Sequence, residues 1–173
     1  MTQIERLVAA GEVPEEFLRE EDRMGYTITT DNKKLWALQI DLMKQAERLC
    51  ERHGLKYFAM GGTLIGAIRH KGFIPWDDDL DIMLSREDYE RFIGYAQKEL
   101  EAPYFLQSPL TDRHFFREHI LLRNSETTCI GKWDARAKCN NGVYIDIFPM
   151  DGWEDTDRCP RYTTRRKSRI NSA

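Results

Sequence analysis

The longest regular pattern of apolar residues follows the first thirty positions. Its members recur at steps of three and four residues, which places them on one face of an α-helix: Leu35, Leu38, Leu42, Ala46 and Leu49. Thr30 can cap the start of this helix, and Gly54 suits the position just after its end. The pattern therefore predicts a helix from about Asp31 to His53 that packs against a sheet.

The residues before this helix predict a smaller helical extension. Ile4, Leu7 and Val8 have helical spacing, and the stretch from Gly11 to Pro14 interrupts it. The charged segment 15–23 predicts a second, short helix. We therefore expect two short helices ahead of the long one.

Beyond Gly54 the apolar segments become short and are separated by turn residues. They predict strands at 56–60, 80–84 and 104–107, two strands within 117–130 around a turn at Asn124-Ser125, and a strand at 143–148 ended by Pro149. Between them, residues 63–70 predict one or two helical turns, and Ser85 opens a helix that runs to about Leu100. Because strands and helices interleave, the chain is expected to be an α/β or α+β domain around one mixed sheet.

The 173 residues form one ordinary domain by length, with 41% hydrophobic residues and no apolar run long enough to cross a bilayer. The acidic N-terminus speaks against a secretory signal. Four cysteines without a CxxC pair favour reduced thiols in a cytosolic protein. A zinc site built from Cys129, Cys139, Cys159 and a histidine is the alternative, but the spacing of the cysteines fits no common zinc pattern.

Charge is unevenly distributed along the chain. Residues 158–173 hold six basic side chains and no acid, which leaves 20 basic and 29 acidic residues elsewhere, a net charge of −9. This acidic body argues against nucleic acid as a partner. The basic tail is either the solvated face of a helix that is truncated at RINSA or a peripheral contact to an anionic membrane or polymer.

The densest chemical signal is the acidic run Trp76-Asp77-Asp78-Asp79-Leu80-Asp81. Residues two apart in a strand share a face, so Asp79 and Asp81 are expected to project together, roughly 6–7 Å apart. Two such carboxylates can ligate Mg²⁺ or Mn²⁺, which prefer oxygen ligands. An acidic loop that caps a helix or forms salt bridges is the alternative, and Asp77 and Asp78 are expected to cap the loop or bind a second ion.

A third acid, Asp146, interrupts the apolar strand 143–148. A carboxylate in such a strand must meet either water or a cation. We therefore expect Asp146 to complete a three-carboxylate metal site, or to face solvent if this strand lies at an edge. As the metal ligands and catalytic residues, the sequence predicts Asp79, Asp81 and Asp146.

Candidate donor-binding residues surround a glycine pair. Gly61 and Gly62 precede a predicted helix, where close backbone approach and free N–H groups favour a phosphate, and Thr63 adds a hydroxyl. Further cations on the helix exit are expected to neutralise phosphate oxygens: Arg69, His70 and Lys71. A plain glycine turn and ordinary surface cations are the alternatives. Trp76 either packs in its loop or covers a quaternary ammonium group.

Two segments carry a resemblance to a known family. MGGTLIGAIRHKGFIPWDDDLDIMLSREDYERF resembles the LicD signature almost residue for residue, and NGVYIDIFPMDG resembles its second block. The intervening LLRNSETTCI is also similar, so the resemblance spans roughly Leu35 to Trp153. It implies a polymerase-β-type nucleotidyltransferase fold, with a helical extension at 1–30, the LicD-type domain at 31–157 and the basic tail at 158–173.

The resemblance also implies a function. LicD enzymes move phosphocholine from CDP-choline onto teichoic acids or lipopolysaccharide sugars, and fukutin-type relatives move ribitol phosphate. The family's glycine pair falls on Gly61 and Gly62, and its metal-binding Asp-x-Asp on Asp79 and Asp81. We therefore expect a cytoplasmic, Mg²⁺- or Mn²⁺-dependent transferase at the inner membrane face, with a CDP-alcohol donor and a glycan or lipid-linked sugar as acceptor. The alternatives are nucleotidyl transfer and a truncated, non-catalytic binding module.

Overall fold

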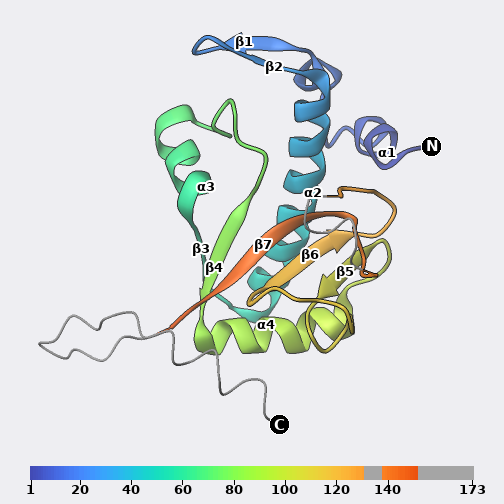
Figure 1. The fold of residues 1–173 in the computed structure, drawn as a ribbon, viewed down its shortest axis with the longest axis vertical. Helices are drawn as coiled ribbons and strands as arrows, with labels where there is room; N and C mark the ends of the chain where they lie inside the picture. The colour runs from blue at the N-terminus through green and yellow to red at the C-terminus, as the bar shows by residue number, and fades with distance from the viewer. Residues whose placement is uncertain (131–137, 152–173) are drawn as a thin grey trace, which may run out of the picture.

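A computed structural model describes residues 1–130 and 138–151 of the chain (Figure 1). Its centre is a five-stranded sheet in the order β3-β4-β7-β6-β5, formed by Tyr57–Ala59, Asp81–Ser85, Val143–Met150, Ile120–Asn124 and Tyr104–Gln107. β4 and β7 run parallel, and the other neighbouring strands are antiparallel. The sheet is therefore mixed, and helices flank it, which confirms the predicted fold class.

Two helices cover one face of the sheet. α2 spans Thr30–His53 and packs against β6 and β7, and α4 spans Arg86–Glu99 and packs against β4, β5 and β7. Their apolar residues share one core with the alternate residues of the strands, among them Leu42, Phe92, Ile82, Leu84, Ile145 and Ile147. Burial of this face stabilises the domain and leaves the intervening strand residues on the opposite face.

The predicted long helix is confirmed, with its start shifted by one residue. Thr29, not Thr30, is the cap: its hydroxyl accepts the Asn32 N–H, and the Asn32 side chain accepts the Thr29 N–H. Gly54 ends the helix at φ 62°, in the left-handed region that glycine adopts without strain. Local capping chemistry therefore fixes both ends of α2.

The N-terminal extension differs from the prediction. α1 (Gln3–Ala9) is present, but the predicted helix at 15–23 is wrong: a single 3₁₀ turn, η1 (Glu15–Leu18), leads into a hairpin of β1 (Glu21–Arg23) and β2 (Tyr26–Ile28). Met24 and Gly25, at φ 56° and 75°, form the two-residue turn. Positive φ at both positions matches the twist of antiparallel strands, so the turn favours a hairpin over a helix.

Two strand predictions also change. Of the two strands expected within 117–130, only β6 forms, and residues 125–130 make no strand. β6 pairs instead with β5 and β7, which are distant in sequence. β7 continues through Pro149, which the sequence predicted to end it. Pro149 lies beyond the end of β6, because the β6–β7 register begins with Ile120 opposite Ile147, so its missing N–H interrupts no bond to that strand.

The glycine pair opens a helical segment beside β3. α3 (Gly61–Ile65) continues into a π-helical turn, η2 (Gly66–His70), and a loop then leads to β4 (Figure 1). Within the described residues, none of the helices has the length and apolar character needed to cross a bilayer. The basic tail at 158–173 and Cys159 lie outside the described part of the chain.

Candidate active site

The acidic run forms a loop directly before β4. Asp77, Asp78 and Asp79 each present a carboxylate oxygen, and these oxygens all lie within 4.8 Å of one another. Asp77 and Asp79 are half-buried, whereas Asp78 is exposed. Convergent carboxylate oxygens are the donor set that Mg²⁺ and Mn²⁺ prefer, so these residues fit a hard divalent cation.

Asp81 is the first residue of β4, and its register partner on β7 is Asp146. Both lie on the face of the sheet opposite α2 and α4, because their neighbours Ile82 and Ile147 are in the core. Asp79 precedes the strand, so it is the loop, not strand alternation, that brings it toward Asp81. The predicted ligand set of Asp79, Asp81 and Asp146 stays a prediction, and the structure adds Asp77 and Asp78 to it as candidates.

Burial and neighbouring negative charges raise the pKa of two of these acids, Asp79 and Asp81. Burial, followed by the charges of Asp77, Asp78 and Asp146, raises the pKa of Asp79 from 3.8 to about 6. Burial together with Asp79, Asp146 and Asp77 raises the pKa of Asp81 to about 7. The folded chain therefore concentrates negative charge at a free-energy cost, which a bound cation would offset.

The glycine pair packs directly against the aspartates. A Cβ on Gly62 would overlap the Asp77 carboxylate, and a Cβ on Gly61 would stand 3.4 Å from Asp81 Oδ2. Gly61 also has φ 52°, a left-handed conformation that side chains disfavour. The Thr63 hydroxyl accepts a 2.8 Å hydrogen bond from the Asp81 N–H, which fastens α3 to the start of β4. The motif thus brings the glycines and the acids into one site.

The other predicted donor-binding residues lie around the loop. Arg69 donates from Nε to His70 Nε2 at 2.8 Å, and His70 meets the Trp76 ring edge-on at 6.1 Å. Trp76 is 53% exposed, and its only other ring contact among the described residues is with Tyr26, at 6.3 Å. Lys71 is also exposed. The roles of Arg69, Lys71 and Trp76 toward a donor stay predictions.

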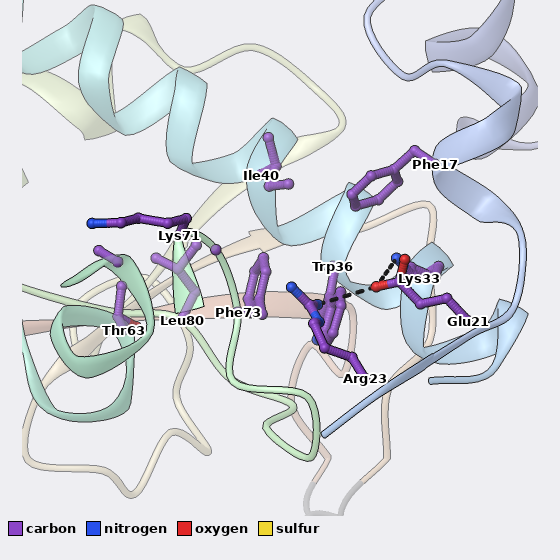
Figure 2. A pocket seen from close by; sticks show the side chains of 12 residues that line it. Phe17, Glu21, Arg23, Lys33, Trp36, Ile40, Thr63, Lys71, Phe73 and Leu80 are labelled. Atoms are coloured by element: carbon purple, nitrogen blue, oxygen red, sulfur yellow. Dashed lines mark ion pairs between the residues drawn. The ribbon is translucent and has the colours of Figure 1, made fainter. Parts of the chain in front are cut away.

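A cavity of about 440 Å³ is lined by residues next to the aspartate loop, among them Leu80 and Trp36, whose indole N–H donates to the Asp77 carbonyl (Figure 2). Thr63, Lys71 and Leu80 stand at one end, whereas Lys33 and Glu21 form a 3.0 Å ion pair at the other. Aromatic and aliphatic side chains line the space between, among them Phe17, Trp36, Ile40 and Phe73. An apolar cavity with a few charged groups is typical of small-molecule sites.

Two residues beside Asp146 were not singled out from the sequence. His119 Nε2 lies 2.6 Å from Asp146 Oδ1, and Arg117 Nη1 lies 3.3 Å from the same oxygen. The His119 ring stacks on Phe148, 4.1 Å away, on the same strand as Asp146. Their spacing in the sequence could have indicated this position. Arg117 and His119 precede β6 at steps of two from Leu121, the register partner of Asp146, so they share its face.

Comparison with known proteins shows the family to which the chain belongs. The family model described as the LicD/FKTN/FKRP nucleotidyltransferase domain matches residues 54–170, more than half of the chain. The chain belongs to this family. The match includes the glycine pair, the aspartate loop, Asp81 and Asp146, so these candidate residues all lie within the family domain. It excludes the N-terminal wall of the cavity, which includes Phe17, Lys33 and Trp36.

Several curated proteins share this family sequence. The chain is similar to the lipopolysaccharide cholinephosphotransferase LicD of Haemophilus influenzae, with 45% identity over 120 residues, 65% of this chain and 42% of that protein. It is also 47% identical to mouse ribitol 5-phosphate transferase FKRP over 104 residues, 58% of this chain and 18% of that protein. An uncharacterized Rickettsia prowazekii protein is 44% identical over 66% of this chain and 39% of its own length. The chain thus aligns with less than half of each relative.

Proposed function

We propose that the protein is a divalent-cation-dependent transferase that moves a phosphocholine-like group from a CDP-alcohol to a hydroxyl of a cell-surface glycan, such as teichoic acid or lipopolysaccharide. The observation that carries this proposal is the meeting of the glycine pair with Asp77 and Asp81 inside the family domain. The names of LicD and FKRP, which are phospho-alcohol transferases, support the reaction class. A lipid-linked or polymeric acceptor would place the reaction at the cytoplasmic face of the membrane.

Mg²⁺ or Mn²⁺ would be held by the carboxylates of the loop and of the two parallel strands. When bound, such a cation neutralises phosphate oxygens and the charge that develops on the leaving CMP. The raised pKa values of Asp79 and Asp81 support this assignment, because burial and neighbouring acids disfavour the ionised carboxylates when no cation is bound. We assign cation binding jointly to Asp77, Asp78, Asp79 and Asp81, and Asp146 either completes this ligand set or accepts the proton of the acceptor hydroxyl.

The remaining residues bind and orient the donor in this scheme. Gly61 and Gly62 let the donor phosphates approach the backbone, and Lys71 and Arg69 supply positive charge. Thr63 and Lys71 line the cavity, so we assign the donor's nucleoside to that space. Trp76, which is exposed beside the aspartates, would cover the ammonium head of a choline-like alcohol.

The transfer itself is a displacement at phosphorus. The acceptor hydroxyl oxygen forms a bond to the phosphorus that bears the alcohol, the bond from this phosphorus to the CMP oxygen breaks, and CMP leaves. The hydroxyl proton passes to a carboxylate, for which Asp146 is the candidate if it is not a cation ligand. His119 and Arg117 both contact Asp146 Oδ1, so they orient this carboxylate.

Calorimetric titration tests the proposal directly. CDP-choline and CTP are titrated with Mg²⁺ into the wild type and into the double variant Asp79→Asn/Asp81→Asn. We expect cation-dependent binding of CDP-choline that the double variant loses. Binding of CTP without CDP-choline would favour nucleotidyl transfer or another CDP-alcohol. A folded wild type that binds neither nucleotide would refute the proposal for this chain and favour a non-catalytic module.

A further inference from the structure

The aspartate loop is anchored from the helix behind it. The loop belongs to no strand, yet it must hold three mutually repelling carboxylates together. Two side chains of α2 donate hydrogen bonds into its main chain. Trp36 Nε1 donates to the Asp77 carbonyl at 2.9 Å, and Gln39 Nε2 donates to the Asp78 carbonyl at 2.8 Å. The two donors stand three residues apart and so share one face of α2.

Trp36 is held in place by its surroundings. Trp36 is 1% exposed, and its ring stacks on Phe73 with 4.8 Å between centroids and 4° between planes. The Lys33 ammonium lies 5.6 Å from the same ring. The indole therefore cannot turn away from the loop unless its neighbours repack. A rigid donor of this kind fixes the carbonyl that it contacts.

The burial of the polar Gln39 side chain costs free energy, and packing alone does not explain why an amide occupies this position. It is 3% exposed, and its Oε1 is buried without a hydrogen-bond partner among the described residues. A leucine would fill a similar volume without burying an unsatisfied side-chain oxygen. What the amide adds is Nε2, which donates to the Asp78 carbonyl and lies 3.5 Å from the Tyr144 carbonyl. This contact links the loop to β7, the strand that carries Asp146.

We propose that Trp36 and Gln39 are positioning residues that hold the backbone of Asp77 and Asp78 so that their carboxylates converge with Asp79. Neither side chain touches the cation in this scheme. The inference rests on the proposed function in one respect, that the convergent carboxylates bind a divalent cation. Without the two donors, repulsion would move the three carboxylates apart. The free energy needed to bring them together again would then weaken cation binding.

A purely structural role predicts a different result. If the two bonds served only to fasten the loop to α2, their loss would lower the melting temperature, yet the folded protein would bind a cation as before. A positioning role predicts weaker binding by protein that remains fully folded. The two roles are therefore separated by measuring cation affinity well below the melting temperature.

The experiment uses Mn²⁺ alone, followed by electron paramagnetic resonance at 10 °C without nucleotide. Trp36→Phe retains a ring against Phe73 but lacks the N–H, and Gln39→Leu removes the other donor. Tyr104→Phe is the matched control, because it removes a partly buried hydrogen bond from Tyr104 to Asp41 on another side of α2. Circular dichroism melts report the folded fraction of every variant.

We expect each loop variant to bind Mn²⁺ about tenfold more weakly, the equivalent of one lost hydrogen bond, and the control to stay within about twofold of the wild type. Folded Trp36→Phe or Gln39→Leu with wild-type affinity would overturn the positioning role alone. If one variant does not fold, the other decides. A wild type that binds no Mn²⁺ would refute the cation site of the proposed function, and the positioning role with it.

Discussion

Replacing Asp81 by Asn should make the cation-free protein more stable, although Asp81 belongs to the proposed site. Burial and three neighbouring acids raise the pKa of Asp81 from 3.8 to about 7. Between these two values the folded state binds more protons at this site than the unfolded state does. The free energy of unfolding therefore falls as the pH rises through this window, and the penalty is complete at pH 8.

The structure sets the size of this effect. A pKa difference of about three units corresponds to about 4 kcal/mol, since one unit is about 1.36 kcal/mol. The side chain is only half-buried, so solvent screens part of that cost. We expect a gain of about 2 kcal/mol for Asp81→Asn at pH 8, which for a domain of this size raises the melting temperature by about 4–8 °C.

Thermal denaturation in EDTA at pH 5 and pH 8 measures this difference. The melting temperature of the wild type should fall from pH 5 to pH 8, and that of Asp81→Asn should fall less. Glu90→Gln, an exposed acid on α4, serves as the control and should melt like the wild type at both values. Added Mn²⁺ should stabilise the wild type and not Asp81→Asn. The reasoning fails if Asp81→Asn melts at or below the wild-type temperature at pH 8 in EDTA.

Three further predictions follow from the same site. Gly62→Ala should displace the Asp77 carboxylate and weaken Mn²⁺ binding about tenfold, whereas Gly94→Ala, which has open space on α4, should leave calorimetric Mn²⁺ affinity unchanged. His119→Ala should cost about 1–3 kcal/mol in urea unfolding, because it removes a partner of buried Asp146; an unchanged midpoint would contradict this. Mn²⁺ affinity should fall as the pH is lowered from 8 to 5, since the carboxyls with pKa values of about 6 and 7 take up protons; a flat profile would exclude them as ligands.

Local patterns in the sequence were sufficient to predict the elements whose structure depends on residues close in the sequence. The spacing of leucines in α2, the glycine that ends it and the helix that begins after Ser85 depend on neighbours within a few residues, and all three were predicted. The capping threonine was missed by one position, since Thr29 and not Thr30 caps α2. The sequence also singled out the glycine pair and the acids together, and the structure places Gly61 and Gly62 against Asp81 and Asp77; their roles as ligands stay a prediction.

Local patterns failed where pairing or turn geometry decided. The charged segment 15–23 has helical composition, but Met24 and Gly25 reverse the chain there and β2 completes a hairpin. Residues 125–130 have strand-like composition, but β6 finds its partners in β5 and β7. A strand is stabilised by whatever lies beside it, which a stretch of sequence does not contain.

The sequence by itself thus determined the long helices α2 and α4, most of the strands and the residues of the acidic motif. Only the tertiary structure decided how that motif is arranged. It paired Asp81 on β4 with Asp146 on β7, although the two residues are 65 positions apart in the sequence. It placed His119 and Arg117 in contact with the Asp146 carboxylate. It also placed two donors of α2 behind the loop. The reason is that distances between charges and donors are set by long-range packing, whereas periodicity records only which face a residue occupies.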